Sequence, residues 1–237
     1  MKVLMTCAGI NTELRPFTDM MPKCLLPING KSILHHNLDW LQKHDIDEVT
    51  ISTSYYSNQI ELALKKYQSK YNIRLHTQKN IIGTAQTLKM LEMRFIENDF
   101  LFLHGDNLYD FDVKKYYNVH KNNGKLLSIL SHYTKEDSKN KSFIKYKDDS
   151  DKIEKISVKP DYKISNDLLA TSGVCYMKPS VFEYLSPKDK QVFDNFIPKM
   201  LDNLNVIVDN NSVKFINSKK KYMTVSNTWS SYECFLS

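Results

Sequence analysis

The chain has 237 residues, of which 41% are apolar, and carries a formal net charge of +6 at pH 7. This length suits one α/β domain with a sizeable core, and no apolar run reaches the roughly 18 residues of a membrane-spanning helix. Its basic residues include only three arginines and one tight cluster, Lys219–Lys221, whereas nucleic-acid surfaces concentrate basic charge with stacking aromatics. We therefore expect no nucleic acid and no membrane as partners.

The cysteines, Cys7, Cys24, Cys175 and Cys234, are scattered along the chain without CxxC spacing. Reduced thiols in a cytoplasmic protein are the ordinary expectation for such a pattern.

The opening stretch combines a predicted strand with a small-residue loop. Met1–Cys7 is a short apolar run, and the turn-prone Ala8–Thr12 follows it. A buried strand that opens into such a loop can cradle phosphate with its backbone N–H groups, and Lys23 could add a positive charge. The loop lacks the Rossmann and Walker glycine patterns, so an ordinary turn followed by a solvated lysine is an equal alternative.

Strands and helices then alternate. Ser32–His44 and Asn58–Tyr71 carry apolar residues at helical spacing, while Asp47–Thr53 and Ile73–His76 are typical of strands. This alternation predicts a parallel sheet with helices on its faces.

Two later segments are candidates for ligand contacts. Gly83 allows close backbone approach, and Thr84 is a good N-cap for a helix over Ala85–Glu97. The apolar strand at Phe100–Leu103 leads into Asp106, where a carboxylate could hold Mg²⁺ on a triphosphate. A capped helix start and an aspartate turn are the plain alternatives.

The motifs together resemble the sugar nucleotidyltransferases. Ala8–Thr18 reads Ala-Gly-Ile-Asn-Thr-Glu-Leu-Arg-Pro-Phe-Thr, and Pro22–Pro27 reads Pro-Lys-Cys-Leu-Leu-Pro. The family signature is Ala-Gly-x-Gly-Thr-Arg-Leu-x-Pro-x-Thr, then Pro-Lys-x-Leu-Leu-Pro. The resemblance covers nearly the whole chain, and it implies a three-layer Rossmann-like fold with a mostly parallel central sheet. It also implies one domain over 1–237, with a nucleotide-binding half at 1–112 and a sugar-phosphate-binding half at 113–237.

The family reaction joins a nucleoside triphosphate to a sugar 1-phosphate, giving an NDP-sugar and pyrophosphate. This implies precursor synthesis for surface polysaccharides or glycans, with Mg²⁺ as cofactor, and the chain could form a homo-oligomer. By resemblance, Lys23 and Arg15 are catalytic candidates and Asp106 is the metal ligand. Nucleotide-binding candidates are Ala8, Gly9, Asn11, Thr12, Gln78, Gly83 and Thr84. Sugar-phosphate candidates are Lys159, Gly173 and Asn107.

The motifs do not determine which nucleotide base the protein binds. Gln78 stands five residues before Gly83, as in relatives whose glutamine pairs with a pyrimidine edge. In contrast, Phe193–Leu201 resembles the helix of the mannose- and heptose-type guanylyltransferases.

Several motif positions depart from the family. Asn11 replaces the second glycine, a mild change because asparagine adopts positive φ readily. Glu13 replaces the arginine, and Val158 replaces a sugar-contacting glutamate. The final motif, Trp-x-Asp-(Ile/Val)-Gly-Thr-Pro-x-x-Tyr, is matched to Met223–Tyr232, which places its metal-binding aspartate at Val225.

Two hypotheses follow from this pattern. The retained Lys23, Asp106 and Gly83 favour an active but divergent enzyme. Glu13 and Val225 favour a catalytically impaired homologue that binds a nucleotide or nucleotide sugar and regulates a partner enzyme.

Overall fold

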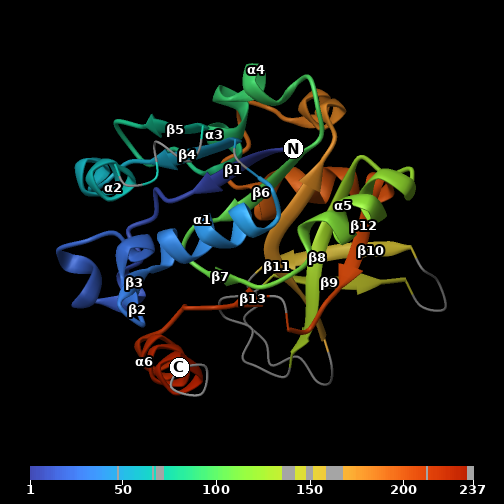
Figure 1. Ribbon diagram of the computed structural model, residues 1–237. Helices are drawn as coiled ribbons and strands as arrows, with labels where there is room; N and C mark the ends of the chain where they lie inside the picture. Colours follow the sequence, from blue (N-terminus) through green and yellow to red (C-terminus); the bar gives the residue numbers. More distant parts are fainter. Residues whose placement is uncertain are drawn as a thin grey trace. The chain divides into compact units, whose positions relative to one another are not determined.

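The structure is a computed structural model that describes residues 1–46, 48–65, 67, 72–134, 142–147, 152–158, 168–211 and 213–233 (Figure 1). The chain divides into two compact units. The first unit comprises the described residues of Val3–Ile81, His104–Phe111 and Ser212–Ser237. The second unit comprises those of Met1–Lys2, Ile82–Leu103 and Asp112–Asn211.

A parallel sheet forms the centre of the first unit. Strand β1 (Lys2–Thr6) pairs in parallel with β4 (Glu48–Thr53), and β4 pairs in parallel with β5 (Asn72–Thr77). Val3, Leu4 and Met5 are fully buried, as expected for parallel strands that read as continuous apolar runs. The helices α1 (Ile33–Lys43) and α2 (Ser57–Leu64) follow β3 and β4 along the chain, so the predicted strand–helix alternation is confirmed.

Short elements complete the first unit. Strands β2 (Pro27–Ile28) and β3 (Lys31–Ser32) form a hairpin, and both of its turn residues, Asn29 and Gly30, have positive φ. That conformation is typical of an Asn-Gly two-residue turn. Strand β7 (Leu108–Tyr109) pairs with β13 (Val213–Lys214). The last helix, α6 (Lys219–Glu233), returns to this unit near the end of the chain.

An apolar cluster connects the opening loop, the hairpin and the C-terminal segment of the first unit. Its buried members are Leu14, Leu26, Ile28, Ile33, Leu108 and Ile216. On α6, Tyr222 packs against this cluster and donates a hydrogen bond from its hydroxyl to the Pro27 carbonyl at 2.8 Å. Segments nearly 200 residues apart therefore share one core.

The second unit is built around the long strand β11 (Leu168–Met177). This strand pairs antiparallel with β6 (Phe100–His104), β8 (Leu127–Thr134) and β9 (Ser142–Tyr146). Strand β10 (Ile153–Val158) pairs antiparallel with β9, and β12 (Leu204–Val208) pairs in parallel with β8. The segment 148–151, which connects β9 to β10 along the chain, lies outside the described residues.

One helix of the second unit is interrupted where the sequence predicts a continuous one, and another has the predicted bounds. The helix expected over Ala85–Glu97 is divided into α3 (Thr84–Met90) and α4 (Glu92–Phe95), because Leu91 between them leaves helical geometry. Helix α5 (Val113–Asn122) begins at the cap Asp112, whose side chain accepts from the Lys115 N–H at 2.9 Å. Three further short helical segments follow, at Pro179–Tyr184, Val192–Phe196 and Ile197–Asn203.

The predicted α/β class is confirmed. Among the described residues, no helix has both the length and the apolar character needed to cross a membrane.

Candidate active site

A buried ion pair joins two of the predicted site residues in the first unit. Lys23 begins a short helix, Lys23–Leu25, directly after Pro22, and its Nζ donates to Oδ2 of Asp106 at 3.0 Å. Lys23 is only 3% exposed. Burial by itself disfavours the charged Asp106 carboxylate, but the Lys23 ammonium and the nearby His104 lower the pKa of Asp106 below its ordinary value. The Asp106 carboxylate is therefore held in its charged form.

Close packing of two strand ends fixes Asp106. The Gly105 N–H donates to the Thr6 carbonyl at 2.9 Å, and a Cβ on Gly105 would collide with the Cys7 sulfur and the Met5 side chain. Only glycine allows the backbone that carries Asp106 to approach β1 this closely. The Asp106 carboxylate is thereby held just after the end of β1, where the opening loop begins.

Cys7 and Cys24 lie in the same buried region, and the Cys7 thiol is unreactive there. A hydrogen bond with Cys24 and burial raise the pKa of the Cys7 thiol well above its ordinary value, and the negative charge of Asp106 acts in the same direction. Because the thiolate is the reactive form, this thiol is not a nucleophile of the site.

The opening loop has the backbone shape that the family glycine would provide. Asn11 has φ of 53°, in the left-handed region, and its Nδ2 donates to the Gly9 carbonyl at 3.1 Å. The Thr18 hydroxyl donates to the Asn11 carbonyl at 2.9 Å, which fixes the loop from outside. The interpretation of Asn11 as a mild replacement is confirmed in its conformation.

The charged residues of the loop are exposed. Glu13 points its charge to the surface, in a short helix over Thr12–Leu14. Arg15 makes an exposed ion pair, from Nε to Oδ1 of Asp19 at 3.0 Å. The catalytic role of Arg15 stays a prediction, since its side chain pairs with this neighbouring carboxylate.

Gln78 and Asn107 are buried polar residues of the first unit. Gln78 follows β5, and its N–H donates to the Thr53 carbonyl at 2.8 Å. Asn107 accepts from the Ile216 N–H through Oδ1 at 3.4 Å, and its carbonyl accepts from Asn37 Nδ2 at 2.7 Å. These bonds give Asn107 a structural role, in holding the C-terminal segment and α1, and its sugar contact stays a prediction.

Other predicted site residues belong to the second unit or lie outside the described residues. Gly83, with φ of 98°, precedes α3, and Thr84 is the first residue of that helix. Gly173, with φ of 73°, lies in an irregularity of the β8–β11 pairing. Lys159 lies outside the described residues.

The residue at which α6 begins changes how the final family motif aligns with this chain. Ser218 caps this helix, because its Oγ accepts from the Lys221 N–H at 3.2 Å, and Ile216 is fully buried. Threonine and proline favour the N-cap and first position of a helix, so Gly-Thr-Pro of the motif fits Asn217–Lys219, and its tyrosine then falls on Tyr222. The structure thus favours Phe215, not Val225, as the place of the family aspartate. Val225 packs against the apolar cluster instead.

The donor set for a metal is small. Among the described residues, no group of three or more His, Cys, Asp or Glu side chains is placed to hold a metal ion. Mg²⁺ is commonly held by one or two carboxylates together with substrate phosphates and waters. Asp106, as a single carboxylate, fits that kind of site. Neither Phe215 nor Val225 has a side chain that could supply a second carboxylate.

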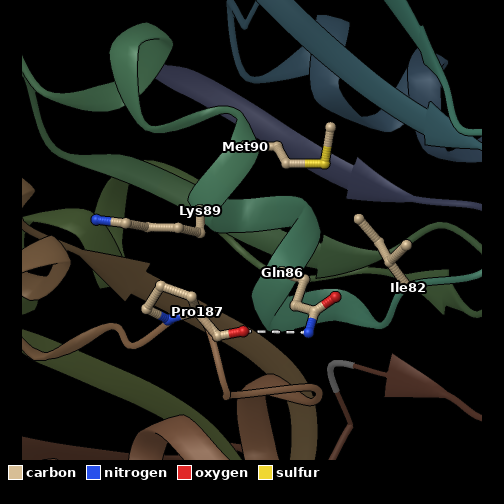
Figure 2. A pocket seen from close by; sticks show the side chains of 5 residues that line it. All are labelled: Ile82, Gln86, Lys89, Met90 and Pro187. Atoms are coloured by element: carbon tan, nitrogen blue, oxygen red, sulfur yellow. Dashed lines mark hydrogen bonds between the residues drawn. The ribbon is translucent and has the colours of Figure 1, made fainter.

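A shallow pocket of about 350 Å³ lies beside Gly83 in the second unit. Figure 2 shows its side chains, which come from the segment before α3, from α3 itself and from the loop at Pro187. Gln86 Nε2 donates to the Pro187 carbonyl at 3.2 Å across it. Ile82, Met90 and Pro187 give it a mainly apolar wall.

Comparison with known proteins defines the class. The model of the nucleotidyl transferase family matches residues 2–230, and the chain therefore belongs to that family. This confirms the resemblance seen in the sequence motifs.

Among curated relatives, the catalytic subunit beta of mannose-1-phosphate guanylyltransferase from Xenopus tropicalis is 29% identical over 204 residues, 84% of this chain and 56% of the relative. The UTP–glucose-1-phosphate uridylyltransferase of Synechocystis is 24% identical over 216 residues, 85% of this chain and 55% of the relative. The chain thus spans little more than half the length of these relatives.

Solved structures share the fold. A candidate glucose-1-phosphate thymidylyltransferase from Bacillus anthracis, in complex with sucrose, has a TM-score of 0.82 at 19% identity, covering 96% of this chain and 94% of that one. HddC from Yersinia pseudotuberculosis has a TM-score of 0.80 at 18% identity, covering 96% and 99%. At these identities the likeness concerns the fold.

Proposed function

We propose that the protein is a sugar-1-phosphate nucleotidyltransferase, which joins a nucleoside triphosphate to a sugar 1-phosphate and releases pyrophosphate. The observation that carries this proposal is the buried Lys23–Asp106 ion pair beside the opening loop. The loop next to this pair contains Ala8 and Gly9, and small residues of this kind let backbone N–H groups approach a phosphate. Family membership supports the same reaction.

The reaction needs positioning and charge neutralisation more than covalent chemistry, because the sugar phosphate attacks the α-phosphorus in line. In the proposal, the backbone of Ala8, Gly9, Asn11 and Thr12 cradles the nucleotide phosphates. Lys23, which Asp106 holds in place through the 3.0 Å contact, offers its ammonium group to the phosphates. At Asp106, the chemistry supplied by a bound Mg²⁺ is neutralisation of the triphosphate.

We infer GTP and mannose 1-phosphate as the first substrates to test. Support comes from the guanylyltransferase relatives, of which the Xenopus tropicalis protein is 29% identical. A second candidate pair is UTP with glucose 1-phosphate, which Gln78 favours and which the Synechocystis relative uses by name. An NDP-sugar made from either pair would serve glycan or polysaccharide synthesis in the cytoplasm, and a homo-oligomer remains part of this proposal.

The test measures pyrophosphate release from the purified wild type with Mg²⁺, each nucleoside triphosphate and a panel of sugar 1-phosphates. Release that requires one particular pair supports the proposal, and the pair names the substrates. Asp106→Asn should lose at least about 100-fold in kcat, as for loss of one electrostatic contact to the transition state. The exposed Asp110→Ala serves as the matched control and should behave as wild type.

Silence across the whole panel would overturn the enzymatic proposal. If a nucleotide still raised the melting temperature of that silent protein, the binding homologue would be the correct description.

A further inference from the structure

The segment from Ser186 to Lys199 packs against Gly83 and Thr84 in the second unit. The Lys190 carbonyl accepts from the Ala85 N–H at 3.0 Å, and the same carbonyl occupies the space that a Cβ on Gly83 would need. The two backbones are therefore in direct contact, and glycine at this position is required both by space and by its φ of 98°.

The hydroxyl and the backbone N–H of Thr84 both make hydrogen bonds within the chain. Its Oγ1 accepts from the Val192 N–H at 2.9 Å and donates to Gln191 Oε1 at 3.0 Å. Its backbone N–H also points to Gln191 Oε1, at 3.4 Å. Because an N–H can only donate, this contact identifies the atom of Gln191 that faces Thr84 as the amide oxygen. Thr84 therefore holds the segment through both its hydroxyl and its backbone N–H.

Further contacts hold the loop that carries Gln191 in place. Asn195 Oδ1 accepts from the N–H groups of Lys190 and Gln191, at 3.1 and 2.9 Å. Lys199 Nζ binds both carboxylate oxygens of the buried Asp189, at 2.6 and 2.7 Å. The carboxylate of Asp189 also accepts from the Ser186 N–H at 2.9 Å, so the loop is tied at both ends.

We infer that Gln191 is a positioning residue for the nucleotide, acting through Thr84 on the backbone at Gly83. The inference rests on the proposed function and on Gly83 as the nucleotide contact that the family resemblance implies. A glycine with positive φ has much conformational freedom, and small misplacements of binding groups weaken productive binding strongly. By accepting from both donors of Thr84, Gln191 keeps the Gly83–Thr84 backbone in one conformation.

Three variants test this role. Gln191→Ala removes the acceptor, and Gln191→Glu keeps an oxygen that can accept from the same two donors. Gln86→Ala is the matched control, because it removes another hydrogen bond from α3 to the same loop without involving Thr84. Gln191 is exposed, so its replacement should leave folding intact.

Steady-state kinetics provide the readout, with the nucleoside triphosphate and the sugar phosphate varied separately. We expect Gln191→Ala to raise the KM for the nucleotide about 3- to 10-fold, the effect of about one hydrogen bond, with kcat within about 2-fold. The KM for the sugar phosphate should not change. Gln191→Glu and Gln86→Ala should both keep the wild-type KM for the nucleotide.

A wild-type nucleotide KM in Gln191→Ala would overturn the inference, and so would an equal rise in Gln86→Ala, which would indicate general loosening of the loop. Thr84→Val approaches the contact from its other side. Its effect combined with Gln191→Ala should be less than the product of the single effects, whereas a full product would contradict coupling through Thr84. Failure of the proposed function is distinguishable, since the wild type itself would then release no pyrophosphate with any substrate pair.

Discussion

At the scale of single residues, the site depends on a lysine that the fold has removed from water. A buried ammonium is stable only with a partner, and Lys23 has Asp106. The pair therefore has two roles that can be measured separately: it stabilises the folded protein, and in the proposed reaction it provides charge to the phosphates.

The stability role predicts a non-additive double variant. Lys23→Met should lower the free energy of unfolding by about 2–4 kcal/mol, because it leaves the Asp106 carboxylate unpaired in a largely buried site. Lys23→Met with Asp106→Asn should cost clearly less than the sum of the two single changes. Denaturant unfolding measures this, and Lys31→Met, at the half-exposed pair with Asp39, should cost less than about 1 kcal/mol. If the cost of the double variant equalled the sum of the two single costs, Lys23 and Asp106 would not stabilise each other.

A second residue makes stability depend on pH. His120 is fully buried beside Ser128, and burial, with a contribution from Lys178, lowers the pKa of His120 to about 4. The unfolded chain, with a pKa near 6.5, therefore binds more protons between these values, and stability falls as the pH drops from about 6.5 towards 4.

We expect the free energy of unfolding to fall by on the order of 1–3 kcal/mol over this range through His120. Unfolding curves of wild type and His120→Gln, recorded from pH 7 to pH 4.5, measure the difference. The variant should lose this part of the slope, and parallel curves for the two proteins would show that His120 does not titrate as expected.

At the scale of elements, glycines with positive φ serve two different purposes in this fold. Gly30 and Gly83 both have positive φ, but they differ in surroundings. Nothing lies within 4 Å of a Cβ built on Gly30, whereas the Lys190 carbonyl blocks one on Gly83. The first glycine serves a turn, and the second serves the contact between α3 and the Ser186–Lys199 segment.

This difference predicts unequal costs of the same substitution. Gly30→Ala should lower the free energy of unfolding by about 1 kcal/mol, the conformational cost of a β-carbon at positive φ. Gly83→Ala should cost at least about 2–3 kcal/mol, because backbone must also move. Thermal unfolding of both variants tests the ranking, and equal losses would refute the steric contact with Lys190.

At the scale of the whole molecule, the two compact units are both discontinuous in sequence. In the first unit, α6 lies beside the β2–β3 hairpin, as Figure 1 shows at the red and blue ends of the chain. The Phe17 and Tyr222 rings lie 5.3 Å apart, so the opening loop and the C-terminal segment are packed together. Changes in both segments can therefore act on the same site.

A gain-of-function prediction follows from that arrangement. Glu13→Arg with Phe215→Asp would restore the two charges that the family motifs carry, and we expect pyrophosphate release to rise at least about 10-fold. Glu13→Arg with Val225→Asp is the contrasting pair. It should give no such gain and should destabilise the protein by about 2–4 kcal/mol, because it places a carboxylate against the apolar cluster. If activity rose only in the variant with Glu13→Arg and Val225→Asp, the family aspartate would correspond to Val225 and not to Phe215.

Part of this fold can be predicted from the sequence. Strand β1 was predictable, because a fully buried parallel strand reads as a continuous apolar run, and the opening motif predicted the family. The place of Asn11 in the left-handed region was also foreseeable from its side chain.

Only the tertiary structure could decide which polar groups meet. The Lys23–Asp106 pair spans 83 residues and the Thr84–Gln191 contact spans 107, and neither leaves a periodic or local signal. The start of α6 likewise depends on Ser218 and on burial of Ile216, which moved the aspartate position from Val225 to Phe215. Local patterns determine elements because they reflect one face of a helix or strand. Contacts between distant segments are selected by packing, and packing is a property of the folded chain alone.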